Sequence, residues 1–460
     1  MRGEYARAAD IGKPKSNVES RDRLSRFTGP GTTACRNQRK GQRMKTKKLS
    51  PEAVRRVDLE AQRILRSPKF FQEFLEAMEE EGLLGEQGNA LVLLIASVSR
   101  LFPRPLSVFV KGSSSSGKNW LVSRVLRLLP AGRVREITSA SDKAWNYSQD
   151  SFRNRIVYLQ ERNQATGRVH PVRLLISEGK LVRIVPRWID GKLVTKKYVA
   201  RGPVAAFSTT TRSALEIDDE TRHISIVTDE SPEQTRRIVQ GYTKQGPGLC
   251  AAERQIWKTV HRLIEQRAKV EVIFPSWFQK VAALVSVDDV RVRRYYPIFV
   301  EACRAVCLIR SFQREPLEKQ NGKLILDFAD FAVAALILER IFVQSMHRHE
   351  GTALEVRQAV EAISATRGGK PVQAEDLARE LGISRERAYE KLREAVTAGA
   401  VCRVNASEKD NRKFFLPASA PRFLPDPEKL FQKLDGVQKS VRFVHPLTGE
   451  WVTYVRAKQK

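Results

Sequence analysis

Cysteine is scarce in this chain of 460 residues, which has only five and no Cys-x-x-Cys pair. A structural zinc site needs several thiolate or imidazole ligands at close spacing, so none is expected. Cys303 and Cys307 lie one helical turn apart on an apolar stripe, and the other three cysteines are isolated. We therefore expect these two thiols to be buried in a helical core.

Long apolar runs are also missing. The longest, from Ala90 to Val98, is much shorter than the roughly twenty residues of a membrane-spanning helix. The chain opens without the pattern of a secretory signal peptide. These features predict a soluble protein of the bacterial cytoplasm, associated with the nucleoid and without a membrane partner.

Acidic residues are in deficit, because 52 Asp and Glu stand against 81 Lys and Arg, a formal net charge of +29. Such an excess of cations most often faces a polyanion, commonly nucleic acid. An acidic membrane surface is the alternative, and the shortness of the apolar runs disfavours it. DNA, single-stranded or duplex, is the expected partner.

The pattern along the chain predicts an α/β fold with additional domains. Strand and helix signals alternate as far as about residue 227, which is typical of a mostly parallel sheet covered by helices. Later residues are helical in period, and a helix-turn-helix pattern follows. The predicted parts are a disordered basic tail at 1–50, a P-loop core at 51–231, a helical lid at 232–350, a winged helix at 351–417 and a C-terminal extension at 418–460.

Residues 106–122 have the pattern of a buried strand, a serine-rich loop bounded by glycines, and the start of a helix. Gly112 and Gly117 permit the sharp turn that points backbone N–H groups at a phosphate, and Lys118 is placed to reach the β- and γ-phosphate oxygens. A serine-rich turn without a ligand is the alternative, but it leaves the flanking strand and helix unexplained. The predicted ATP-binding residues are Gly112, Ser113, Ser114, Ser115, Ser116, Gly117, Lys118 and Asn119.

Two amides stand near the expected position of Mg²⁺. Asn119 follows the lysine where a Ser or Thr usually holds the metal, and Gln160 ends a short apolar strand where many ATPases carry Asp. Glu161 is the candidate for orienting the attacking water, and Thr210 or Thr209 ends the next strand near the γ-phosphate. The alternatives are a solvated carboxylate and ordinary turn-forming threonines. Because both amides are uncharged, weak metal binding and slow hydrolysis are consistent with the sequence.

A hairpin is predicted between these two strands, at residues 181–199, because Asp190-Gly191 is flanked by strand-forming residues. Trp188 and several cations lie near its tip. A basic and aromatic finger of this kind can follow a phosphate backbone. The alternative is a surface hairpin that uses lysine to protect its edges from pairing. The cations predicted to bind DNA are Arg187, Lys192, Lys196 and Lys197.

The order of phosphate loop, Glu-ended strand, helix with hairpin, polar-ended strand and Glu220-Thr221-Arg222 resembles AAA+ ATPases of the pre-sensor-1 hairpin clade, which includes replicative helicases. The closer likeness is to the helicase-like half of primase-related proteins of bacterial mobile elements. That likeness covers roughly residues 80–345. The segments that carry it are 104–118, 177–180, 202–204, 209–211 and 229–236.

That resemblance implies a ring of identical subunits whose hairpins line a channel and grip DNA. Arg222 matches the arginine finger that acts on the ATP of the neighbouring subunit. Arg293 matches the second-sensor arginine of the lid; Arg291 and Arg294 fit that position equally, and a solvated helix end is the alternative. The first hundred residues hold no zinc-finger cysteine set and no acidic polymerase cluster, so a primase would be a separate partner.

Residues 373–392 match the helix-turn-helix pattern, with apolar residues at helical spacing, Gly382 in the turn and Ser384 capping the second helix. A wing at 405–412 follows. Winged-helix domains that this segment resembles contact DNA through the second helix, and others contact proteins, so both uses stay open. The cations predicted to reach DNA are Arg385, Arg387 and Lys391 on the helix, with Arg403 near the wing.

Two functions are consistent with these features. The first is an ATP-dependent DNA-remodelling motor, such as a replicative helicase or helicase loader of a mobile element. The second is a DNA-binding regulator that uses ATP as an assembly switch and scarcely hydrolyses it. Glu161, Arg222 and the hairpin favour the motor, whereas Asn119 and Gln160 favour the regulator.

Overall fold

The computed structural model describes residues 50–138, 151–160, 171–189, 192–212, 222–243, 246, 248–285, 287, 291–314, 322–346, 352–397, 400–404, 414–417, 424–435 and 437–456. The chain divides after Glu52 into two units, of which the second is Ala53–Lys460. The second unit contains the central sheet and the helices that cover it. The predicted basic tail lies outside the described residues, apart from Ser50.

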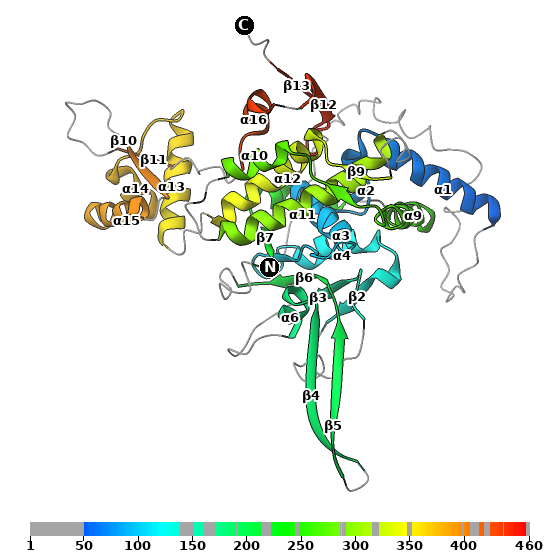
Figure 1. The fold of residues 1–460 in the computed structure, drawn as a ribbon. Helices are drawn as coiled ribbons and strands as arrows, with labels where there is room; N and C mark the ends of the chain where they lie inside the picture. The colour runs from blue at the N-terminus through cyan, green and yellow to red at the C-terminus, as the bar shows by residue number, and fades with distance from the viewer. Residues whose placement is uncertain are drawn as a thin grey trace, which may run out of the picture. The chain divides into compact units, whose positions relative to one another are not determined.

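A five-stranded parallel sheet forms the centre of the second unit (Figure 1). Its strand order is β2-β3-β6-β1-β7, and every neighbouring pair is parallel. All residues of β1, β3 and β6 are buried, as expected of strands covered on both faces. The α/β class with a parallel central sheet is therefore confirmed. The strands are β1 Val108–Lys111, β2 Val134–Ile137, β3 Ile156–Leu159, β6 Ala205–Thr210 and β7 Ile224–Val227.

Parallel pairing gives this sheet two different ends. Its carboxyl end carries the residues that follow β1, β3, β6 and β7, beginning at Gly112 after β1 and Thr228 after β7. Its amino end carries the residues that precede the same strands, such as Ser107 and His223. The strand β6 lies between β1 and β3, although it follows both in sequence. The phosphate loop therefore meets the ends of β6 and β7 at the carboxyl end.

Helices from the first half of the chain pack on the sheet and on each other. The helix α3 is apolar on all sides, and every residue from Ala90 to Ser99 is buried, as a helix in the middle of a core requires. It packs against α2, α4, α11 and α12. The helices of this part are α1 Pro51–Arg66, α2 Phe70–Glu80, α3 Gln87–Ser99 and α4 Lys118–Arg127, with the short turn η3 Ala131–Arg133.

A largely helical region follows β7 and shares the main apolar core. Within it, Cys303 and Cys307 are fully buried on α11, and this burial raises the pKa of both thiols well above the ordinary value. The prediction of buried thiols is confirmed for these two, whereas Cys402 is exposed. The elements are α8 Pro232–Tyr242, α9 Ala251–Arg267, β8 Val272–Ile273, α10 Trp277–Leu284, α11 Val292–Arg310, η4 Ser311–Gln313, β9 Leu324–Ile325 and α12 Phe328–Met346.

A long antiparallel hairpin, β4 Lys180–Ile189 and β5 Lys192–Arg201, projects from the amino end of the sheet (Figure 1). It is preceded by α6 Pro171–Ser177 and leads directly into the start of β6. The Phe152 N–H donates to the Arg201 carbonyl at 2.7 Å, and the Gly202 N–H donates to the Gly179 carbonyl at 2.8 Å. The base of the hairpin is fixed by these bonds and by a small apolar cluster that includes Leu181 and Ala200.

A winged helix with its own apolar core occupies residues 352–417. Gly382 adopts a left-handed conformation with φ of 63° at the end of α14, as the turn between the two helices requires. The Ser384 hydroxyl accepts the Arg387 N–H at 3.3 Å and caps α15. The predicted wing lies outside the described residues. The elements are α13 Thr352–Thr366, α14 Ala374–Leu381, α15 Arg385–Thr397, β10 Val401–Val404 and β11 Phe414–Pro417.

The C-terminal segment packs on the main core rather than standing apart. Phe431 and Tyr454 lie 4.9 Å and 6.4 Å, between ring centroids, from Phe328 of α12. The Gln72 side chain donates to the His445 carbonyl at 2.7 Å. The elements are α16 Pro427–Lys433, β12 Ser440–Val444 and β13 Trp451–Val455. Across the described part of the chain, the helices lack the combination of length and apolar content that a membrane crossing needs.

Candidate nucleotide site and nucleic-acid interface

The phosphate loop connects β1 to α4 at the carboxyl end of the sheet, as predicted. Gly112 has a φ of 156°, and a Cβ atom there would lie 2.5 Å from Ser116 Oγ and 2.9 Å from Glu230 Oε1. Gly117 has a φ of 86° immediately before α4. A side chain at the first position would fill the loop, and one at the second would strain its backbone. Both glycines are therefore required by the geometry.

Lys118 is buried at the start of α4, and its ammonium group turns back over the loop. The Lys118 Nζ donates to the Ser113 carbonyl and lies 3.5 Å from Ser116 Oγ. Both partners are neutral, and no ion pair of Lys118 is found in the described part of the chain. A buried cation that has only neutral partners, beside a helix N-terminus, favours an anionic ligand.

The segment after β7 closes on this loop, and the sequence analysis did not anticipate it. The Thr228 hydroxyl lies 2.8 Å from Ser116 Oγ and 3.2 Å from the Lys111 carbonyl. The Glu230 carboxylate accepts the Ser113 N–H at 2.5 Å. A backbone N–H of the loop therefore already binds an anionic group of the protein itself. The sequence signals were the polar end of a strand and the resemblance of residues 229–236, and neither gave this contact, because it depends on β7 being the neighbour of β1.

Both amides predicted near Mg²⁺ are bonded to other side chains. The Tyr158 hydroxyl, on buried β3, donates to Asn119 Oδ1 at 3.1 Å. The Gln160 amide, directly after β3, donates to Glu136 Oε1 of the neighbouring strand β2 at 2.5 Å. Among the described residues, no group of three or more His, Cys, Asp or Glu side chains could hold a metal ion. Asn119 Oδ1 keeps one acceptor site, so the structure offers at most a sparse protein contribution to a metal.

Of the remaining catalytic candidates, the structure describes Thr209 and Thr210 but not Glu161. Glu161 lies outside the described residues. Thr210 is buried at the end of β6. It is in register with Lys111, the last residue of β1. Its hydroxyl oxygen accepts the Arg212 N–H at 3.1 Å, an ordinary turn contact, and keeps its own hydrogen to donate. Thr209 is buried one residue earlier, in register with Val110.

The lid arginine predicted at Arg293 is exposed near the start of α11, and no contact joins it to the loop in the described part of the chain. Arg340 of α12, in the region predicted to be a lid, has its charge close enough to Glu86 and Asp229 to lower the pKa of both carboxyls. Burial raises the pKa of Glu86, and the Asp229 N–H and the Arg340 charge oppose that rise. Asp229 directly precedes Glu230 in the segment that closes the phosphate loop.

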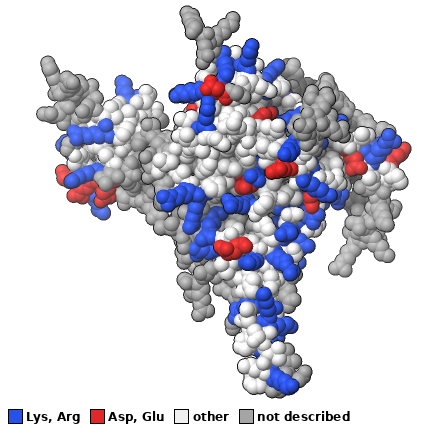
Figure 2. Space-filling view, in the orientation of Figure 1, with Lys and Arg blue, Asp and Glu red and all other residues white. Residues whose placement is uncertain are grey.

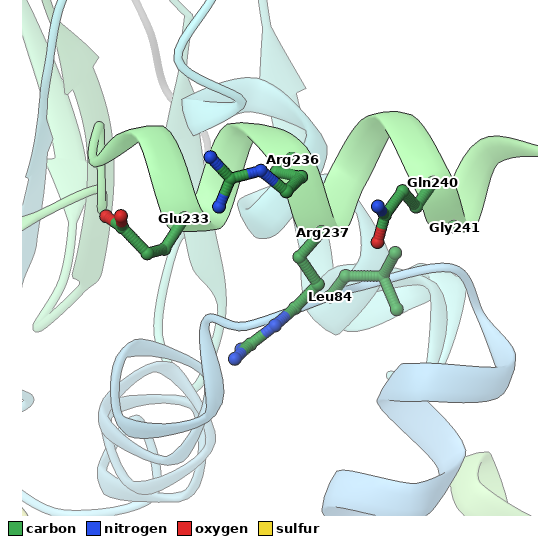
Figure 3. Close-up of a pocket in the computed structure, with 6 residues that line it drawn as sticks. All are labelled: Leu84, Glu233, Arg236, Arg237, Gln240 and Gly241. Atoms are coloured by element: carbon green, nitrogen blue, oxygen red, sulfur yellow. The ribbon is translucent and has the colours of Figure 1, made fainter.

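A shallow hollow lies beside the same segment, on α8 (Figure 3). The Ser231 hydroxyl caps α8 by accepting the Gln234 N–H at 3.2 Å, and the Gln234 amide donates to the Leu84 carbonyl at 2.6 Å. The hollow therefore lies where α8 packs on the loop before α3. Figure 3 shows Arg237 extending past Leu84. The lining residues are Leu84, Glu233, Arg236, Arg237, Gln240 and Gly241.

Arg222 lies at the amino end of the sheet, on the far side from the phosphate loop. Ile224 pairs with Val108 and Val227 with Lys111, so Arg222 precedes the start of β1 in register. At about 3.3 Å per residue, six residues of extended chain separate Arg222 from Thr228 by roughly 20 Å. The Arg222 guanidinium contacts Ser177 Oγ at the end of α6, next to the base of the hairpin. Arg222 cannot reach the loop of its own subunit in this arrangement.

The hairpin has two chemically different faces, because paired residues share a face and successive residues alternate. We call one the basic face: Arg183, Arg187, Lys192 and Lys196, with Tyr198. The Tyr198 ring lies 5.4 Å from the Lys196 ammonium and 5.9 Å from the Arg187 guanidinium carbon. We call the other the apolar face, after its exposed side chains Val182, Ile184, Trp188 and Leu193; Lys180 and Arg201 lie on the same face at the base of the hairpin. Lys197 lies on the apolar face, opposite to the other three cations predicted to bind DNA.

The winged helix is charge-balanced, unlike the hairpin (Figure 2). Arg385 pairs with Glu375 at 3.0 Å, and Lys391 pairs with Glu355 at 2.9 Å, whereas Arg387 is exposed. Six acidic residues stand against five basic ones on α14 and α15. Arg403 is exposed on β10. The DNA-reading role of this helix stays a prediction, and its surface does not present the basic patch that such a role favours.

Comparison with known proteins adds little to this picture. No protein-family model matches the chain, and no curated protein matches it. Among solved structures, the chain is similar to the Orc1 protein of Aeropyrum pernix in complex with DNA, at 13% identity and a TM-score of 0.24. The similarity covers 77% of this chain and 93% of that one. At this TM-score the likeness carries no weight, so the fold assignment depends on the sheet order and registers above.

Proposed function

We propose that this chain is an ATP-dependent motor that remodels DNA and works as a ring of identical subunits. One observation carries the proposal. The sheet separates the phosphate loop at its carboxyl end from Arg222 and the basic hairpin at its amino end. A nucleotide on one subunit can therefore meet an Arg222 only from a neighbouring subunit. Such an arrangement makes hydrolysis depend on assembly.

The described residues fit a nucleotide better than they fit a metal. Backbone N–H groups of the loop and the Lys118 ammonium would hold the phosphates of ATP. Mg²⁺ would have the Asn119 oxygen as a protein ligand, with the rest of its shell from water and phosphate. Bound ATP supplies a γ-phosphoryl group whose transfer to water releases free energy.

Each side chain would then have one task. Lys118 balances charge on the β- and γ-phosphate oxygens, and the Arg222 of the neighbour stabilises the charge that develops in the transition state. Glu161 orients the attacking water, and Thr210 donates its remaining hydrogen toward it. The hairpin cations hold the DNA backbone in the central channel. Arg293 or Arg340 of the lid would sense the nucleotide.

The sequence resemblance suggests the biological setting. It links the chain to the helicase-like half of primase-related proteins of bacterial mobile elements, without the primase half. A replicative helicase with a separate primase as partner is the function that this resemblance favours. DNA, single-stranded at the hairpin and duplex ahead of it, would be the substrate.

A second function is favoured by a specific observation. Asn119 is held by Tyr158 and Gln160 by Glu136, and both amides are uncharged, so they offer a metal only neutral oxygens in place of the usual hydroxyl and carboxylate. A protein with this site could bind ATP and hydrolyse it very slowly. It would then be a DNA-binding regulator that assembles on ATP and disassembles rarely.

The deciding experiment measures ATP turnover by the purified chain with and without single-stranded DNA, followed by strand displacement on a forked duplex. The motor predicts turnover that DNA stimulates, and displacement that needs ATP. Tight ATP binding with turnover at background would contradict the motor and support the regulator. The Lys118→Ala variant is the control for contaminating ATPases.

A further inference from the structure

The four side chains that define the apolar face of the hairpin are exposed. The exposed fractions are 73% for Trp188, 61% for Leu193, 61% for Ile184 and 43% for Val182. Trp188 and Leu193 pair directly across the ladder, one pair before the turn. A row of large exposed apolar side chains usually marks a surface that binds a ligand, a membrane or another macromolecule.

We propose that Trp188, backed by Leu193, stacks on unpaired bases of single-stranded DNA, while Lys197 binds a phosphate of the same strand. The proposal rests on the proposed function and deepens it, because it names the part of the DNA that the hairpin recognises. Lys197 lies on the same face as Trp188, four residues further along the ladder. At about 3.3 Å per residue this is roughly 13 Å, about the span of two nucleotides.

The charge of the hairpin decides between DNA and other occupants. The described part of β4 and β5 contains no Asp or Glu and seven cations: Lys180, Arg183, Arg187, Lys192, Lys196, Lys197 and Arg201. A second hairpin of the same chain would bring the same charges and be repelled. An occupant with regular negative charge and flat apolar faces fits both faces of the hairpin. Single-stranded DNA has both properties.

The two faces then do different work. Phosphate contacts of the basic face depend steeply on salt, and both single-stranded and duplex DNA offer phosphates to them. Stacking on Trp188 needs a base that is not already stacked within a duplex. The apolar face therefore supplies the preference for single strands, and the basic face supplies most of the salt-dependent affinity.

The test titrates a fluorescent oligonucleotide with the full chain over a series of salt concentrations. Trp188→Ala is expected to weaken binding about five- to one-hundred-fold, with an unchanged slope of log affinity against log salt. Trp188→Phe should retain most of the affinity, because it keeps an aromatic face. Trp451→Ala is the matched control, since Trp451 is 47% exposed on another two-stranded sheet and should not affect binding.

A second arm replaces the DNA by an abasic strand of the same length. The abasic strand should bind the wild-type chain as weakly as ordinary DNA binds Trp188→Ala, and the variant should not distinguish the two strands. Lys196→Ala, on the opposite face, should lower the salt slope by about 0.7 and weaken both strands equally. These two signatures separate stacking from charge.

Several results would overturn the proposal. Equal affinity of wild-type and Trp188→Ala for DNA would refute stacking and leave the motor intact. Absence of single-strand binding by the wild-type chain would instead refute the proposed function itself. Loss of oligomers by Trp188→Ala, with DNA affinity retained, would identify the apolar face as a protein interface. Tighter binding of an RNA strand of the same sequence would refute DNA as the occupant.

Discussion

The two ends of the central sheet differ in charge and in the kind of group they expose. At the carboxyl end, the phosphate loop is closed by its own lysine and by the Glu230 carboxylate. At the amino end, an open hairpin carries cations and exposed apolar side chains. Between them lie the buried strands β1, β3 and β6. The proposed chemistry and the proposed DNA contact would thus be built from separate residues, and mutation should separate them.

Two strands run directly from one end to the other. The strand β6 begins four residues after the hairpin and ends at Thr210 beside the loop, with every residue buried. The strand β7 begins beside Arg222 and leads to Glu230. Any shift of the hairpin on DNA would reach the phosphate loop most directly through these strands, because packed strands move as units.

The largest effect is expected from Lys118→Ala at the carboxyl end. Removing a buried cation that binds phosphate should weaken ATP binding about one-hundred-fold and reduce turnover to background. DNA binding without nucleotide should be unchanged, because the hairpin lies at the other end. Titration with a fluorescent ATP analogue and with a labelled oligonucleotide measures both. Unchanged ATP affinity would refute the phosphate-loop assignment.

Arg222→Ala should reduce turnover about one-thousand-fold, as the loss of an arginine finger does, while ATP affinity changes less than about two-fold. The reason is the distance of Arg222 from the loop of its own subunit. Mixing Arg222→Ala with Glu161→Gln subunits should restore part of the activity, since some interfaces then hold both intact groups. A large loss of ATP affinity, or no recovery in any mixture, would contradict action between subunits.

Replacing Arg187, Lys192 and Lys196 together by Ala should remove three of the four cations of the basic face. The salt slope for single-stranded DNA should fall by about 2, at about 0.7 for each phosphate contact. DNA stimulation of turnover should fall in parallel, whereas basal turnover should persist. If the slope and the stimulation both survive, the hairpin is a solvated edge and another surface holds the DNA.

The site was predictable from sequence only where its signals are local. Gly112, Gly117 and Lys118 lie within seven residues, so the local sequence determines the turn of the phosphate loop and the position of the lysine. The contacts of Thr228 and Glu230 with the phosphate loop were missed because they depend on β7 lying beside β1. Strand order cannot be predicted from a local sequence pattern. The position of Lys197 was missed for a related reason, since the face of a strand residue depends on register.

Long-range partners also escaped prediction at the amide and winged-helix positions. Asn119 is engaged by a hydroxyl from a buried strand, and the cations of the reading helix are engaged by acids of two other helices. By contrast, the α/β class, the hairpin and the helix-turn-helix followed from periodicity and turn residues, because these signals act over a few residues. Charge composition alone did not show that the cations of the winged helix are paired with acids, whereas the described hairpin strands contain no acid.

A smaller effect is expected from Glu230→Gln. The exposed carboxylate competes with phosphate for the Ser113 N–H, so its neutralisation should tighten ATP binding about two- to five-fold. Asp229→Asn, one residue earlier, is the control, because its oxygen bonds the Ser231 N–H rather than the loop. Weaker ATP binding by Glu230→Gln would show that the carboxylate helps to hold the ligand.

The smallest effect is expected at the winged helix. Replacing Arg385, Arg387 and Lys391 by Ala should change single-strand affinity less than about three-fold, because Glu375 and Glu355 already balance two of these cations. The matched comparison is the basic-face triple variant, which removes the same number of charges. A loss as large as that of the hairpin variant, or a selective loss for one duplex sequence, would make α15 a DNA-reading helix after all. Melting temperature should fall slightly, since the Lys391 pair joins α15 to α13 across the domain.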